Sequence, residues 1–209
     1  MASDRLEAAL IFGVPGAGKG TQGEILARIP GFFHCSSGVI FRKMDPDSED
    51  GQLVRDFSSR GELVPDDLTI RIWRNWIDAQ RAIGSYLPRK HLLLLDGIPR
   101  TPEQCAILQE HIDVKSIVHL VCEYEEAMIE RIRLRAMREN RPDDLNEEVT
   151  RRRFEVYRKE TLPVLDCYPS DIISEVESNG MVAEVLADVL RHLVPVLKER
   201  VNARRVSPK

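Results

Sequence analysis

Residues 8–12, AALIF, lead directly into a glycine-rich stretch, residues 13–22, GVPGAGKGTQ. An apolar run, a glycine loop and a helical pattern in this order are typical of a strand that turns into a helix. The glycines let successive backbone N–H groups point toward an anion, and the helix N-terminus adds its positive dipole end. Lys19 adds a mobile positive charge. The stretch therefore predicts a phosphate-binding loop within an α/β fold.

The loop nearly fits the pattern G-x-x-x-x-G-K-[ST], in which the last residue supplies a hydroxyl. Gly13, Gly18 and Lys19 fit, but Gly20 stands at the Ser/Thr position, and the hydroxyl comes one residue later, at Thr21. We interpret Gly20 as a position where the backbone comes close to a phosphate, and Thr21 as the candidate hydroxyl ligand.

Short apolar runs alternate with helical patterns along the rest of the chain. The predicted strands are 8–12, 32–35, 92–95, 116–121 and 171–176, and the predicted helices are 21–29, 49–59, 66–82, 101–111, 123–137, 146–165 and 181–199. This alternation is typical of a parallel sheet covered by helices on both faces. Segments 36–90 and 131–153 interrupt this alternation of strands and helices. Because ligands of such sheets bind beyond the carboxyl ends of the strands, these segments are candidates to close over a substrate.

Composition excludes several classes of protein. The 209 residues suit one domain, and a net charge of −4 does not suit a nucleic-acid-coating protein. The four cysteines form no C-x-x-C pair, which favours reduced thiols over a zinc site. The first ten residues are too polar for a signal peptide, and no apolar run reaches the roughly 18 residues of a membrane span. We expect a cytoplasmic protein with no nucleic-acid or membrane partner.

Two further features suit phosphate chemistry. Asp96 ends the buried run LLLLD, where a carboxylate near the loop can hold Mg²⁺ directly or through water. Arginines crowd the segment 131–153: Arg131, Arg133, Arg135, Arg138, Arg141, Arg151, Arg152 and Arg153. Planar bidentate donors of this kind neutralise the charge of a moving phosphoryl group. We expect three or four working arginines, with the others solvated or paired with nearby acids, and a phosphotransferase with a closing lid.

Five segments together resemble the adenylate kinases and the wider family of nucleoside monophosphate kinases. They are GVPGAGKGTQ (13–22), SSGVIFR (36–42), GELVPDD (61–67), DGIPRTPEQ (96–104) and the arginine and paired-aspartate segment 140–168. The resemblance implies the reaction ATP + AMP ⇌ 2 ADP with Mg²⁺ in a single kinase domain of residues 1–209. It also implies a core of 1–35, 91–130 and 154–209, a helical monophosphate-binding insert at about 36–66, and a short lid at about 131–145 that lacks structural zinc.

The resemblance assigns roles position by position. The residues implied for ATP are Gly16, Ala17, Gly18, Lys19, Gly20, Thr21, Arg131, Arg135 and Gly180. Those implied for AMP are Ser37, Arg42, Glu62, Leu63, Val64, Gly97, Ile98, Pro99, Arg100, Gln104, Arg141 and Arg153. The catalytic set is Lys19, Arg42, Arg100, Arg135, Arg141 and Arg153, with Asp96 (through water) and Thr21 for the metal. ATP and AMP are the expected partners of a monomer.

Two alternatives stay open. In UMP or CMP kinases, Asn usually follows the Pro-Arg signature; here Thr101 does, and Gln104 stands where adenine is read, so AMP is favoured. The other is a nucleotide sensor without catalysis. This alternative is favoured by Val39, where the family often has Asp, and by Ala136 and Asn140, which stand in place of lid glycines. A GTPase is disfavoured because no N-K-x-D motif occurs.

Overall fold

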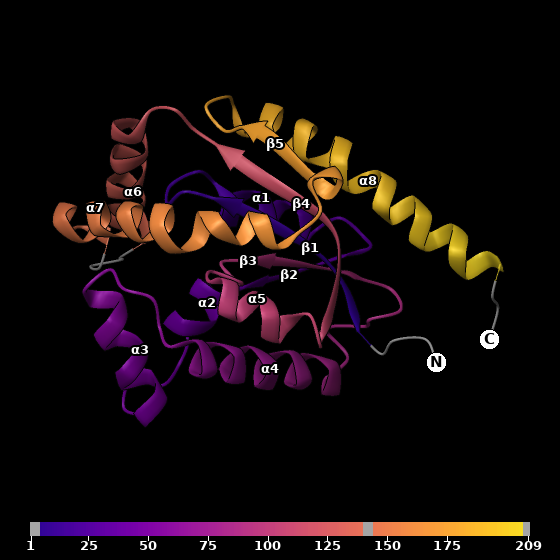
Figure 1. Ribbon diagram of the computed structural model, residues 1–209, viewed down its shortest axis with the longest axis horizontal. Coiled ribbons are helices and arrows are strands. Elements are labelled where there is room, and N and C mark those ends of the chain that lie inside the picture. Colours follow the sequence, from indigo (N-terminus) through magenta and orange to yellow (C-terminus); the bar gives the residue numbers. More distant parts are fainter. Residues whose placement is uncertain (1–4, 140–143, 207–209) are drawn as a thin grey trace.

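The computed structural model describes residues 5–139 and 144–206. A single five-stranded sheet forms the centre of the molecule (Figure 1), in the order β2-β3-β1-β4-β5. Its strands are β1 (Leu6–Gly13), β2 (Phe32–Ser36), β3 (Leu92–Asp96), β4 (Ile112–Val121) and β5 (Ile173–Glu177). All neighbouring strands are parallel. The predicted fold class, a parallel five-stranded sheet flanked by helices, is confirmed.

Helices connect the strands and cover both faces of the sheet (Figure 1). They are α1 (Lys19–Leu26), α2 (Ser37–Arg42), α3 (Glu49–Ser59), α4 (Asp66–Ala82), α5 (Pro102–Leu108), α6 (Glu125–Glu139), α7 (Glu147–Val156) and α8 (Val182–Val206). A π turn (Tyr157–Thr161) and two 3₁₀ turns (Leu162–Cys167 and Ser170–Ile172) lie between α7 and β5. None of the helices in this described part of the chain combines the length and apolarity that a membrane crossing needs.

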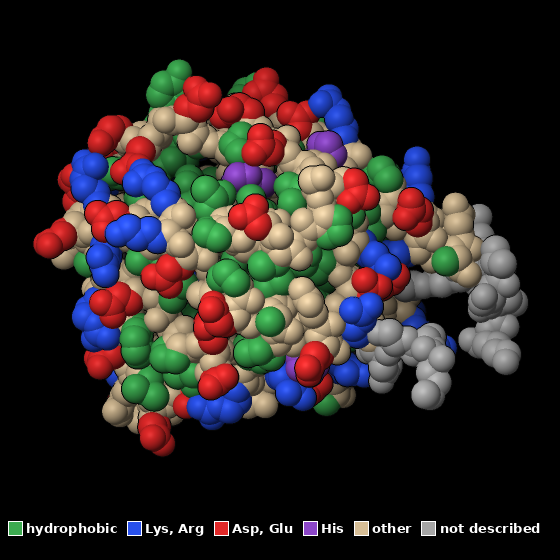
Figure 2. Space-filling model, viewed as in Figure 1, with side chains coloured by type: hydrophobic (Ala, Val, Ile, Leu, Met, Phe, Trp, Pro, Cys, Tyr) green, Lys and Arg blue, Asp and Glu red, His purple; other side chains and the backbone are tan. Residues whose placement is uncertain are grey.

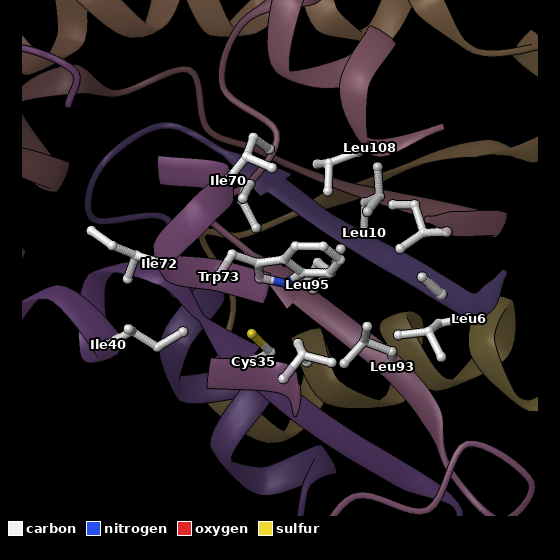
Figure 3. Close-up of a cluster of buried hydrophobic side chains, with 14 of the residues drawn as sticks. Leu6, Leu10, Cys35, Ile40, Ile70, Ile72, Trp73, Leu93, Leu95 and Leu108 are labelled. Carbon is white, nitrogen blue, oxygen red and sulfur yellow. The ribbon is translucent and has the colours of Figure 1, made fainter. Parts of the chain in front are cut away.

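The four leucines of β3 divide the core into two layers. Leu93 and Leu95 pack with side chains of α4 and α5, whereas Leu92 and Leu94 pack with those of α1 and α8. All four are fully buried, as the leucine run predicts for a central strand. Figure 3 shows the first layer, where the indole of Trp73 on α4 lies among the side chains of Leu95 and its neighbours.

Several predicted boundaries are wrong. The helix expected over 146–165 leaves α geometry after Val156, because Pro163 has no N–H and its ring disfavours a regular turn before it. The predicted strand 116–121 begins earlier, at Ile112, which pairs with Leu6 at the start of β1. The strand expected over 171–176 begins at Ile173, after a 3₁₀ turn.

Segment 80–91, which carries no motif, holds the edge of the sheet in place. The ring of the buried Tyr86 lies 4.9 Å from that of Phe33 on β2. Arg200 of α8 donates hydrogen bonds to the carbonyls of Pro88 (3.0 Å) and His91 (2.9 Å), and it forms an ion pair with Glu7. The segment therefore joins β2 to the far part of α8.

Leu94→Ala removes a fully buried side chain between the sheet and α8. We expect the free energy of unfolding to fall by about 2–5 kcal/mol, because the vacated volume cannot fully collapse. Chemical denaturation monitored by circular dichroism measures this change. Ile83→Ala, at a side chain 71% exposed, is the control and should change stability by less than about 0.5 kcal/mol. Equal effects of the two substitutions would contradict the assignment of this core.

Candidate functional site

One large cleft opens at the carboxyl ends of the strands. Its volume is about 1400 Å³, whereas a pocket for one small ligand is typically about 300–1,000 Å³, so there is room for two nucleotides. Of the predicted site residues, those that line the cleft are Gly16, Ala17, Gly18, Lys19, Gly20, Thr21, Arg42, Glu62, Leu63, Val64, Asp96, Gly97, Ile98, Pro99, Arg100, Gln104, Arg131, Arg135, Arg153 and Gly180. Ser37 is buried just behind the cleft wall. Arg141, like Asn140, lies outside the described residues.

The glycine loop adopts a conformation that few other residues allow. Gly16 and Gly18 have φ angles of +87° and +91°, in the left-handed region. A Cβ atom on Gly16 would also lie 2.9 Å from the carbonyl oxygen of Met128 on α6. Helix α1 begins at Lys19, directly after Gly18. The loop therefore brings its own N–H groups and a helix N-terminus to one wall of the cleft.

The Lys19 ammonium folds back over the loop. Its Nζ donates to the carbonyl oxygens of Gly13 (2.6 Å) and Val14 (3.0 Å). An ammonium group has three N–H donors, so one remains for a ligand oxygen. Burial lowers the pKa of Lys19 to about 8, although the negative charge of Asp96 opposes this change. An arriving phosphate would favour the charged form and raise the pKa again.

Asp96 ends β3 beside the loop, with only 6% of its surface exposed. A Cβ atom on Gly20 would lie 3.8 Å from its Oδ2, and Nε2 of His34 on β2 lies 3.7 Å from the same oxygen. Burial opposes ionisation of Asp96, but the neighbouring His34, Lys19 and Arg100 outweigh it and lower its pKa. The carboxylate is therefore available as an anion.

These oxygens fit magnesium. Mg²⁺ prefers oxygen ligands and is commonly bound through one or two carboxylates together with substrate phosphates and water. Asp96 would supply the carboxylate, and Thr21, an exposed residue that lines the same cleft, would supply a hydroxyl. His34 was missed in the sequence analysis. The sequence feature that could have indicated it is a histidine within the otherwise largely apolar strand FFHCS.

Three of the arginines that line the cleft are Arg42, Arg100 and Arg153. Arg100 Nε donates to the carbonyl oxygen of Gly97 at 2.8 Å. Burial lowers the pKa of Arg100, Asp96 raises it, and the positive charges of Arg153 and Arg42 lower it further. Like charges gathered in this way favour a bound anion.

Asp144 holds two of the predicted arginines together. Its carboxylate accepts from Arg135 Nη2 at 2.6 Å and from Arg153, and its side chain is only 2% exposed. Arg153 also donates to the carbonyl oxygen of Ser58 at 3.5 Å, so it spans from α7 to α3. The sequence shows Asp144 as one of two paired aspartates, but it gives no sign that this residue joins Arg135 to Arg153.

Arg131 joins α6 to the loop that follows β5. Its Nη1 donates to the carbonyl oxygen of Ser178 at 3.0 Å, which brings α6 against the loop that contains Gly180. Arg131 and Gly180, far apart in the sequence, therefore line the same part of the cleft.

The remaining arginines of this region pair with acids, as expected. Figure 2 shows basic and acidic side chains mixed over α6 and α7, at the left of the view. The ion pairs are Arg133–Glu130, Arg138–Glu139, Arg151–Glu147 and Arg152–Glu155.

Gly97 lies in a tightly packed part of the cleft wall. Its φ angle is +78°, and a Cβ atom there would lie 2.6 Å from Ser37 Oγ and 2.9 Å from Arg100 Nη2. The Ser37 hydroxyl donates to the Gly97 carbonyl oxygen at 2.7 Å, behind the cleft wall. Val64 lines the cleft, and its carbonyl oxygen accepts from Thr69 Oγ1 at 3.2 Å.

Arg42 lies over the start of α2. A Cβ atom on Gly38 would be 3.2 Å from Arg42 Nη1, so the guanidinium folds back over this glycine. Val39, which replaces the acid often found in the resembled family, lines the cleft next to it.

Comparison with known proteins identifies a family. The family model described as adenylate kinase matches residues 11–173. An adenylate kinase of Thermus thermophilus is 38% identical over 189 residues, which cover 88% of this chain and 95% of the relative. Adenylate kinases of Clavibacter michiganensis and Parabacteroides distasonis are 38% and 35% identical. The first aligns over 84% of this chain and 87% of its own length, and the second over 76% and 82%.

Gly97→Ala should destabilise the protein more than Gly84→Ala. Both glycines have a positive φ, but nothing lies within 4 Å of a Cβ atom on Gly84. Both variants therefore carry backbone strain, and only Gly97→Ala adds overlap with Ser37 and Arg100. We expect it to cost about 1–3 kcal/mol more than the control, by chemical denaturation. Equal losses would contradict the tight packing around Gly97.

Proposed function

Because the chain belongs to the adenylate kinase family, we propose that its cleft transfers the terminal phosphoryl group of ATP to AMP and releases two ADP, reversibly and with Mg²⁺. The observation that carries this proposal is the single continuous cleft. The glycine loop, the arginines Arg42, Arg100 and Arg153 and the amide of Gln104 all line this cleft, and its volume suits two nucleotides.

On the donor side, the ATP phosphates bind the N–H groups of residues 16–21 and the third N–H of Lys19. Arg135 contacts these phosphates from α6, and Arg131 packs against the adenine beside the backbone of Gly180. The ion pair with Asp144 holds Arg135 in place before the phosphates arrive.

On the acceptor side, Arg42 and Arg100 bind the phosphate of AMP. Gln104 reads the adenine edge, and the backbone of residues 62–64, with Ser37 behind the wall and residues 97–99 beside it, lines the base. Arg153, together with Arg141, bridges toward the transferring phosphoryl group.

Catalysis of this kind needs no covalent bond to the protein. The residues hold the attacking oxygen and the phosphoryl group in line, and the arginines and Lys19 neutralise the negative charge that spreads over the phosphoryl oxygens. When bound, Mg²⁺ would neutralise and orient the phosphates. Asp96, through water, and Thr21 would hold it.

The domain assignment belongs to the same proposal. Residues 36–66 form the monophosphate-binding insert, and residues 131–145 form a short lid that excludes water when it closes over both nucleotides. We also propose that the protein is a cytoplasmic monomer. Four free cysteines suit a reducing compartment.

A coupled assay of ADP formation with ATP plus AMP, GMP, UMP or CMP tests the function. We expect AMP to be the best acceptor by at least tenfold in kcat/KM, and Lys19→Met to remove most turnover while the circular dichroism spectrum is kept. Faster transfer to UMP or CMP would overturn AMP as the acceptor. ATP binding without transfer to any acceptor would instead identify a sensor.

The pH dependence of kcat/KM for ATP tests the lowered pKa of Lys19. In the free enzyme its pKa is lowered to about 8, so the ammonium that attracts the phosphates loses its proton as the pH rises. We expect kcat/KM for ATP to fall about tenfold per pH unit well above pH 8. Because bound phosphates raise the pKa, kcat at saturating ATP should stay nearly constant there. A kcat/KM that is flat to pH 10 would contradict the lowered pKa.

A further inference from the structure

Three polar side chains meet where helices α4 and α5 begin. Thr101 Oγ1 and Gln104 Nε2 both donate to Oδ1 of Asp66, at 3.0 and 2.8 Å. On the other side of the same amide, the backbone N–H of Arg100 donates to Gln104 Oε1 at 2.7 Å. The oxygen of the Gln104 amide thus faces a hydrogen-bond donor, and its NH₂ group faces an acceptor.

These two partners allow only one orientation of the amide. A carboxylate only accepts hydrogen bonds, and a backbone N–H only donates them. If the amide turned over, its oxygen would face the Asp66 carboxylate and its NH₂ would face the N–H of Arg100. Both hydrogen bonds would be replaced by repulsive contacts, at a side chain that is only 1% exposed.

The fixed amide still has groups for a ligand. An amide has two N–H donors and two oxygen lone pairs, and Asp66 and Arg100 use one of each. Gln104 lines the cleft, so the remaining N–H and lone pair are available to a base there. Adenine presents an amino donor at position 6 and an acceptor at N1. A 6-oxopurine presents the reverse, an acceptor at O6 and a donor at N1.

We infer that Asp66 determines specificity by positioning: it fixes the Gln104 amide in the orientation that matches adenine and opposes a 6-oxopurine. This inference rests on the proposed function, in which AMP occupies this side of the cleft. Asp66 itself touches no nucleotide in this account. It acts through Gln104, and Thr101 keeps the carboxylate in place.

The simpler explanation of Asp66 is that it stabilises α4. Acidic residues in a first turn interact favourably with the helix dipole, and both Asp66 and Asp67 lie in the first turn of α4. Asp67 is exposed and provides a matched control, because its loss removes the same charge from the same helix end. Of these two aspartates, Asp66 is the one that accepts a hydrogen bond from Gln104.

The test compares AMP with inosine monophosphate (IMP), whose base is a 6-oxopurine, as acceptors of phosphate from ATP. In Asp66→Leu, which removes the acceptor oxygens but keeps the bulk, we expect the ratio of kcat/KM for AMP to that for IMP to fall at least tenfold. The KM for ATP should stay within about twofold. Asp67→Leu should keep the wild-type ratio. Asp66→Asn, which still offers an acceptor oxygen, should return the ratio to within about threefold of wild type.

If Asp66 only stabilised the helix, its loss would lower kcat/KM for AMP and for IMP by the same factor and leave their ratio unchanged. An unchanged ratio in folded Asp66→Leu would therefore overturn the inference while the kinase assignment stands. Wild-type protein that transfers no phosphate to AMP would overturn the proposed function itself. Thermal melts establish folding, and if Asp66→Leu is unfolded, Asp66→Ala is used with the same expected and contradicting results.

Discussion

The Asp96 carboxylate lies at the end of the central strand, almost removed from water, where an unpaired charge would be very unfavourable. Lys19, Arg100 and His34 lower its pKa despite that burial. The first two have further contacts, Lys19 with the loop carbonyls and Arg100 with Gly97. Because a buried charge needs partners in fixed places, the position of Asp96 at the end of its strand is linked to the positions of the glycine loop and of Arg100.

A second buried carboxylate, Asp144, has a comparable role elsewhere along the cleft. Asp144 gathers Arg135 and Arg153 between α6 and α7, and Arg153 reaches α3. A guanidinium that is already oriented loses less conformational freedom when it binds a phosphate. Asp96 and Asp144 thus have four of the cations that we propose for catalysis, Lys19, Arg100, Arg135 and Arg153, as neighbours.

Local patterns in the sequence predicted much of this arrangement. The strand before the glycine loop, the leucine run of β3 and the position of Asp96 follow from periodicity and spacing. Periodicity and spacing do not predict the contacts between segments that share no pattern. Three such contacts are His34 with Asp96, Asp144 with Arg135, and Asp66 with Gln104. The break at Pro163 shows a related limit: a helical pattern continued through a residue that cannot continue the helix.

The proposed reaction requires that one cleft hold donor and acceptor together with their phosphates in line. Calorimetric titration with two adenosines joined by five phosphates tests it most directly, since such a ligand fills both halves at once. We expect one ligand per chain, bound at least a hundredfold more tightly than ATP or AMP alone. Two ligands per chain, or an affinity no better than that of ATP, would contradict it.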